Sequence, residues 1–234
     1  MDEFGQAIRI SLDLLINLQP ELLEIIGLSL KVSLAATLLA ALIGLPLGAA
    51  VAVYRFPGRS VLAALLNAMM GLPPVVVGLG VYLMLSRAGP LGDLGLLFTP
   101  QAMVIAQCLL IAPLIAALTR QTIADLDHSC REQLQVLNTS QHVMVATLLR
   151  DAWLSLTTAV LAGFGRAVAE VGAVIIVGGN IKGVTRVMTT TIALETSKGN
   201  LALAMALGFV LLAVAISINL LAGMLQHAAA RRHA

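Results

Sequence analysis

Five apolar segments, each close to the length that crosses a bilayer, occupy most of this 234-residue chain. An α-helix needs about 20 apolar residues to cross the hydrocarbon core. Within lipid, only helices and closed barrels satisfy every backbone hydrogen-bonding group. Because these apolar runs are long and continuous rather than alternating, the sequence predicts an all-α membrane protein with five transmembrane helices. The predicted spans are residues 25–53, 61–85, 102–118, 152–177 and 201–225.

The composition agrees with a membrane protein and argues against several other classes. Hydrophobic residues make up 59% of the chain and charged residues only 11%, whereas a soluble domain carries about 25% charged residues. A net charge of +2, with no continuous basic strip, argues against nucleic-acid binding. The cysteines, Cys108 and Cys130, have no Cys/His spacing typical of a metal site. The chain also lacks paired acids or a nucleophile with a base, so we expect neither a metal site nor an enzyme.

The first 20 residues differ from the spans that follow. They alternate loosely at helical spacing, with Arg9 and Asp13 one turn apart, and the pattern stops at Pro20. This segment is too short to cross a bilayer, so we predict a helix along the membrane surface over residues 1–20. The chain start lacks the basic stretch and cleavage site of a secretory signal. We therefore expect the first span to act as an uncleaved insertion signal.

Two of the predicted spans contain residues that alter helix packing. Pro73 and Pro74 are consecutive, and because each removes a backbone donor, the second span must kink or break there. Such a break either shapes a gate along a transport path or bends the helix to fit its neighbours, and both alternatives stay open. In the first span, Gly44 and Gly48 flank Pro46 and predict a face that another helix can approach closely.

The distribution of basic residues sets the predicted orientation. Five spans place the two chain ends on opposite sides of the membrane. Seven Lys or Arg residues fall in the loops and tail that we assign to the cytoplasm, against six on the other side. The positive-inside rule therefore favours an N-terminus outside the cell and a C-terminus in the cytoplasm.

A polar, helix-forming loop separates the third and fourth spans at residues 126–151. Ser129 and Glu132 have the spacing of a capping box, which predicts a helix start. Asn138 favours the left-handed conformation that ends a helix. The sequence therefore predicts a short helix, a bend at residues 138–140 and a second helix leading to Asp151, which we expect to cap the fourth span.

Two polar features lie at or beside membrane depth after this loop. Arg166 and Glu170 are four residues apart and would share one side of a helix. Because an unpaired charge is costly in a membrane, we expect them to pair; the pair either staples the bundle or lies along an anion path. Thr189 and Thr190 offer hydroxyl donors to an oxyanion route, or serve ordinary helix-start chemistry.

The polar loop resembles a motif found in membrane subunits of ATP-binding-cassette (ABC) importers. In their last long cytoplasmic loop, these subunits carry Glu-Ala-Ala, a Gly six residues after the Glu, and then Ile-x-Leu-Pro. Glu132 stands at the first position here, and Leu148 replaces the Ile. The sequence departs from the motif at five positions: Gln133 and Leu134 replace the two alanines, Asn138 replaces the glycine, and Arg150 and Asp151 replace Leu-Pro. Asn138, like glycine, tolerates the left-handed bend, and Asp151, like proline, favours a helix start.

Other segments resemble the molybdate and tungstate importer permeases more specifically, in the same order along residues 22–225. They are GLPPVVVG at 71–78, SRAGPLG at 86–92, GFGRAVAEVG at 163–172, GGNI at 178–181 and GVTRVMTTTIALETSKG at 183–199. The last segment is most similar to the tungstate branch. The resemblance implies a single permease domain over residues 1–234, with a transmembrane core at 22–225 and the type I ABC importer permease fold.

The same resemblance implies how such a subunit works. It implies an inner-membrane permease for an oxyanion, tungstate before molybdate, formed by two copies of this chain with two cytoplasmic ATPases and an external solute-binding protein. No Gly-x4-Gly-Lys-Ser/Thr loop occurs in the sequence, so we expect ATP and Mg on the partner ATPase and no cofactor on this chain. The residues that it implies in ATPase coupling are Arg131, Glu132, Leu134, Leu137, Asn138, Thr139, Ser140 and Val143.

Two alternatives stay open. Glu132 either contacts the ATPase or is only a helix cap. A stand-alone secondary transporter or channel for a small anion would need coupling residues in the membrane. Only Arg166 and Glu170 qualify, and no internal repeat supports this class.

Overall fold

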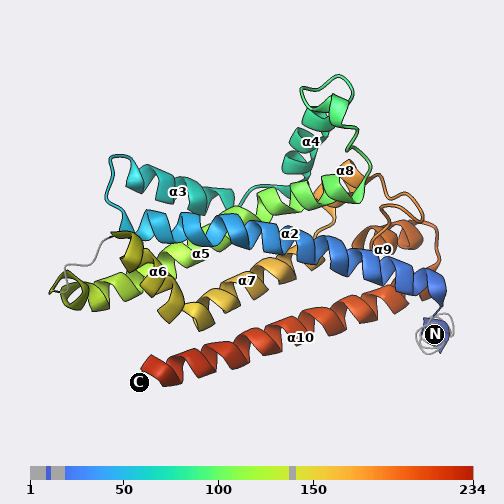
Figure 1. Ribbon diagram of the computed structural model, residues 1–234. Helices are drawn as coiled ribbons and strands as arrows, with labels where there is room; N and C mark the ends of the chain where they lie inside the picture. Colours follow the sequence, from blue (N-terminus) through green and yellow to red (C-terminus); the bar gives the residue numbers. More distant parts are fainter. Residues whose placement is uncertain (1–8, 12–18, 137–140, 234) are drawn as a thin grey trace. The chain divides into compact units, whose positions relative to one another are not determined.

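The structure is a computed structural model that describes residues 9–11, 19–136 and 141–233. Side chains are described outside 127–136, 141, 142 and 227–233. The described chain is helical and contains no strand (Figure 1). Its elements are α2 Pro20–Val53, α3 Arg59–Met69, α4 Pro74–Leu85, η1 Gly92–Leu94, α5 Pro100–Val136, α6 Gln141–Asp151, α7 Trp153–Val168, α8 Gly172–Gly178, α9 Met188–Ser197 and α10 Leu201–His233.

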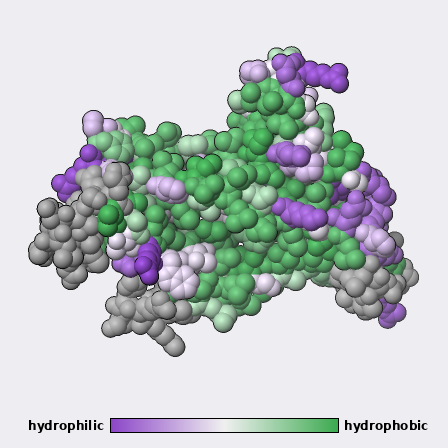
Figure 2. All heavy atoms as spheres, in the orientation of Figure 1, coloured by the Kyte–Doolittle hydropathy of each residue, from purple (hydrophilic) through white to green (hydrophobic). Residues whose placement is uncertain are grey.

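The all-α membrane architecture is confirmed. Three helices, α2, α5 and α10, are long and apolar enough to cross a membrane, and the number rises to five if each of two bent helix pairs forms one span. Most of the surface seen in Figure 2 is hydrophobic, as expected where lipid replaces water. The predicted surface helix at residues 1–20 lies largely outside the described residues.

The break at the two prolines is confirmed. The helix before it, α3, ends at Met69, and α4 begins at Pro74 with Pro73 at its N-cap in an extended conformation. Proline is tolerated there because the first helical N–H has no partner inside the helix. Single prolines do not break the other spans, since Pro46 lies within α2 and Pro113 within α5.

Two other predictions about helix ends are wrong. The helix α5 continues through Ser129 and Glu132 to Val136, so no helix starts at the proposed capping box. Asp151 is the last residue of α6 rather than the cap of α7, which begins at Trp153. The polar stretch after the third span consists largely of good helix formers, so nothing in it forces α5 to end.

The fourth span is also interrupted, contrary to the prediction. Its helix, α7, ends at Val168, and α8 starts at Gly172. The break contains the charged residue Glu170, in the middle of what the sequence predicted to be one helix over 152–177.

The described chain divides into two compact units. Unit 1 comprises the described residues of Met1–Ala36, Pro73–Gln107 and Arg166–Ser217. Unit 2 comprises those of Thr37–Leu72, Cys108–Gly165 and Ile218–Ala234.

In unit 2, α2 and α5 pack with their backbones close together. A Cβ added to Gly44 would lie 2.9 Å from the carbonyl oxygen of Ala112, and one added to Gly48 would lie 2.3 Å from that of Ala116. The predicted small-residue face is therefore confirmed, because only glycine permits this approach.

In unit 1, the short helices α4 and α8 pack in the same way. A Cβ added to Gly78 would lie 2.7 Å from the Cα of Ala173. The loop that follows α4 is tied to the end of α8, where Phe98 donates its backbone N–H to the carbonyl of Val177 at 3.0 Å. Phe98 has a positive φ of 62°, so its backbone occupies a region that non-glycine residues rarely adopt.

Candidate functional site

The amphipathic helix α6 carries the described part of the predicted coupling loop. Met144 and Leu148 are buried in a hydrophobic cluster with residues of α2, α5 and α7. On the opposite side, Val143 is 54% exposed and Arg150 is exposed. One face of α6 is therefore anchored within unit 2, while the other is free to meet a partner.

The remaining coupling residues stay predictions. Arg131, Glu132 and Leu134 lie in the last turns of α5, in a stretch whose side chains are not described. The predicted bend, with Leu137, Asn138, Thr139 and Ser140, lies outside the described residues. Since α5 runs through Glu132, the interpretation of this residue as a helix cap is wrong.

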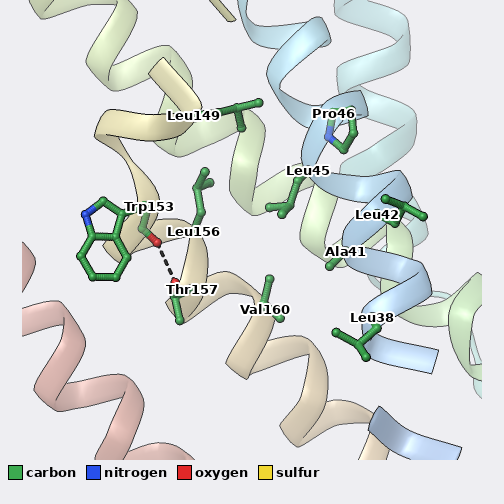
Figure 3. Close-up of a pocket in the computed structure, with 10 residues that line it drawn as sticks. All are labelled: Leu38, Ala41, Leu42, Leu45, Pro46, Leu149, Trp153, Leu156, Thr157 and Val160. Atoms are coloured by element: carbon green, nitrogen blue, oxygen red, sulfur yellow. Dashed lines mark hydrogen bonds between the residues drawn. The ribbon is translucent and has the colours of Figure 1, made fainter. Parts of the chain in front are cut away.

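An apolar groove of about 580 Å³ lies beside the 75° bend between α6 and α7 (Figure 3). Side chains of α2, α6 and α7 line it, and Trp153 at its edge is half exposed. The one hydroxyl in the groove, on Thr157, donates to the backbone carbonyl of Trp153 at 2.7 Å. Apart from this hydroxyl and the indole N–H of Trp153, the side chains that line the groove are apolar, so the groove is a poor fit for an oxyanion.

Arg166 and Glu170 do not form the expected pair. Because α7 ends at Val168, the two residues no longer share one helix face. Arg166 is exposed, whereas Glu170 is 8% exposed, and no ion pair joins them among the described residues. The prediction that Arg166 and Glu170 form an ion pair is therefore wrong.

Glu170 instead holds the chain break together. Its Oε1 accepts the backbone N–H of Ala173 at 3.1 Å, in the first turn of α8. Its backbone carbonyl accepts the hydroxyl of Thr189 at 2.8 Å. The carboxylate therefore satisfies an N–H that has no partner inside α8, as N-terminal capping groups do.

The threonines at the start of α9 bond within the protein. Thr190 Oγ1 accepts the backbone N–H of Val187 at 3.2 Å, and Thr191 donates to the carbonyl of Val187 at 2.7 Å. Both side chains are buried. These contacts match the helix-start alternative, although the role of Thr189 and Thr190 along a transport path stays untested.

The structure adds polar residues that the sequence analysis missed. Gln107, buried in α5, donates its Nε2 to the carbonyl of Ala167 at 3.0 Å. Ser29 of α2 accepts the backbone N–H of Met188 at 2.8 Å. A glutamine within an apolar span is itself a signal, because a polar group at membrane depth needs a partner.

Two charged clusters lie at the ends of helices in unit 1. Lys182 forms an exposed ion pair with Glu21 at 2.7 Å. Glu195 accepts hydrogen bonds from Lys198 and Asn200, both at 2.9 Å. These two bonds, that from Lys198 first, lower the pKa of the Glu195 carboxyl below its usual value. Among the residues that the structure describes, no group of three His, Cys, Asp or Glu side chains is placed to hold a metal ion.

Known proteins similar to this chain identify its class. Residues 44–233 match the family described as the binding-protein-dependent transport system inner membrane component. The chain belongs to this family. It is therefore a multi-pass inner-membrane permease subunit of an ABC importer, a transport class that works with an ATPase and a solute-binding protein. The predicted type I ABC permease fold is confirmed with it.

Three relatives illustrate the similarity. The tungstate uptake system permease protein TupB of Peptoclostridium acidaminophilum is 40% identical over 94% of this chain and 96% of its own length. A probable anion ABC transporter permease protein of Haloferax volcanii is 40% identical over 86% of this chain and 88% of its own. TupB of Campylobacter jejuni is 36% identical over 71% of this chain and 70% of its own.

Proposed function

We propose that this chain is the permease of an ATP-driven importer for an oxyanion, with tungstate favoured over molybdate. The observation that carries the proposal is the 40% identity to a tungstate uptake permease over 94% of this chain. The second relative, named only as an anion permease, supports the broader substrate class.

The proposed assembly contains two copies of this chain, two cytoplasmic ATPases and an external solute-binding protein. ATP and Mg bind the ATPases, and hydrolysis takes place there. The absence of a phosphate-binding loop from the sequence supports this division of labour. Ion selection then rests with the solute-binding protein, and the path lies between the two permease copies.

We propose that the segment from Arg131 to Val143, together with α6, docks on the ATPase. Support comes from the two faces of α6: buried Leu148 fixes the helix, and exposed Val143 and Arg150 remain available. An apolar side chain that is half exposed next to a charge is typical of a surface that packs against a partner.

Reconstitution tests the function directly. The purified permease, ATPase and solute-binding protein are placed in liposomes, and uptake of tungstate and molybdate is measured with and without ATP. We expect uptake to require ATP and all three proteins. Uptake by the permease alone, driven by a proton or sodium gradient, would contradict the proposal and support a secondary transporter.

A variant of Val143 tests the docking face in the same liposomes. Val143→Asp places a charge in the proposed contact, and we expect uptake to fall about tenfold, the effect of losing about 1.4 kcal/mol of contact energy. Val143→Ile keeps an apolar surface and should transport at the original rate. Equal uptake by the two variants would show that Val143 does not contact the ATPase.

A further inference from the structure

A small polar cavity lies inside unit 1, where α2, α5 and the break after α7 meet. The cavity volume open to the centre of a water molecule is about 10 Å³. That is the space for one water molecule or one small ion. Its polar lining residues are all buried: Ser29, Ser33, Gln107, Glu170 and Thr189.

Gln107 brings an unsatisfied acceptor to this cavity. Its side chain is 3% exposed, and its Oε1 has no hydrogen-bond partner among the residues that the structure describes. The orientation of the amide is set by chemistry, because Nε2 donates to the carbonyl of Ala167, and a carbonyl oxygen only accepts. A buried acceptor without a partner destabilises the fold, so the cavity favours an occupant that Oε1 can bind.

Thr189 and Glu170 present acceptors to the same cavity. Thr189 uses its only hydroxyl proton on the carbonyl of Glu170 at 2.8 Å. It therefore presents lone pairs alone. Glu170 accepts the N–H of Ala173 through Oε1, which uses one of the roughly four acceptor positions of an ionised carboxylate. Gln107 Oε1, Thr189 Oγ1 and the Glu170 carboxylate therefore present more lone pairs to the cavity than the two protons of one water molecule can satisfy.

The electrostatics of the site also favour a positive occupant. Glu170 is buried, and among the described residues no basic side chain forms an ion pair with it. Ala167 and Val168, at the C-terminal end of α7, line the same cavity. The ends of interrupted membrane helices bind cations through this partial negative charge. A tungstate ion would meet mainly acceptors here, so the site is unsuited to the transported oxyanion.

We propose that this cavity binds a single monovalent cation of the size of sodium. Gln107 Oε1, the Glu170 carboxylate and Thr189 Oγ1 are its ligands, and the serine hydroxyls complete the oxygen set. One carboxylate matches one positive charge, whereas sites for calcium generally use several carboxylates. The ion neutralises Glu170 and links α2 and α5 to the break between α7 and α8.

Thermal unfolding of the purified full-length chain in detergent tests the site without any transport measurement. The Tm is recorded in NaCl and in choline chloride at equal ionic strength. A ligand that binds only the folded state raises the Tm as its concentration grows. We expect a rise of about 5 °C once sodium exceeds its dissociation constant roughly a hundredfold. The same Tm in sodium and in choline at every concentration would overturn the proposal.

Matched variants locate the ion. Gln107→Leu and Glu170→Gln should lose the sodium-dependent rise in Tm. Thr119→Val is the control, because Thr119 is equally buried but does not line the cavity, and it should retain the rise. A sodium-dependent rise that persists in both Gln107→Leu and Glu170→Gln would place the ion elsewhere and overturn the site. If neither variant folds, the unaltered chain still tests the proposal, because an equal Tm in sodium and in choline would overturn it.

Discussion

Arg59 shows how one charged residue can end a membrane helix. Its Nε donates to the carbonyl of Val51 at 2.7 Å, and its Nη2 donates to that of Ala52 at 2.6 Å. Both carbonyls lie in the last turn of α2, where helix carbonyls have no partner within the helix. A guanidinium supplies two donors and a positive charge at the negative end of the helix dipole. Arg59 is one of the seven basic residues that the sequence analysis assigned to the cytoplasmic loops and tail. Its contact with α2 could not be predicted, because only the fold brings it back onto that helix.

This contact predicts a loss of stability when Arg59 is changed. Hydrogen bonds to a charged group contribute about 1.5–3 kcal/mol when buried, and Arg59 is only half-buried. We therefore expect Arg59→Ala to cost about 2 kcal/mol in total, which lowers the Tm by roughly 4–8 °C. The measurement is thermal unfolding in detergent. Arg55→Ala is the control, since Arg55 is exposed, and its Tm should change by no more than about 2 °C. Similar losses for both variants would show that the α2 end does not depend on Arg59.

At the scale of elements, the sequence predicted helix breaks well only where a single residue type enforces them. Two prolines remove two donors, so the end of α3 and the start of α4 could be placed in advance. The break between α7 and α8 was missed because alanine and valine surround Glu170, and local preference there favours a continuous helix. That break is held by contacts with Ala173 and Thr189, and the second of these lies 19 residues away. The missed cavity around Gln107 has the same origin, since its bond to Ala167 joins residues 60 apart.

The close approach of α2 and α5 predicts opposite effects for two glycines of the same helix. A Cβ at Gly48 would lie 2.3 Å from the carbonyl oxygen of Ala116, which is backbone and cannot rotate away. Gly48→Ala should therefore force the helices apart, at a cost of about 1–3 kcal/mol. Gly27 has no atom within 4 Å of an added Cβ, so Gly27→Ala should gain up to about 1 kcal/mol from better helix propensity. Thermal unfolding of both variants measures the difference. A stabilising Gly48→Ala would contradict the tight α2–α5 contact.

At the scale of the whole molecule, the composition alone identified a membrane protein, whereas its topology depends on the two bent helix pairs. If both pairs cross the membrane, the chain has five spans; if neither crosses, it has three. Both counts put the termini on opposite sides, but they place the loop after α4 on opposite sides. Basic residues favour the orientation with the C-terminus in the cytoplasm by only seven against six.

We predict five spans, with the N-terminus outside and the C-terminus in the cytoplasm. Ala88 is exposed in the loop after α4, so Ala88→Cys should react with a membrane-impermeant thiol reagent applied to intact spheroplasts. Cys108→Ser and Cys130→Ser provide the background without native thiols. Three spans would leave Ala88 on the cytoplasmic side, and labelling would then require permeabilised cells.

A C-terminal fusion to green fluorescent protein should fluoresce, because that protein matures on the cytoplasmic side. A labelled Ala88→Cys together with an external C-terminus would show that the five-span topology is wrong, because five spans with Ala88 outside require a cytoplasmic C-terminus.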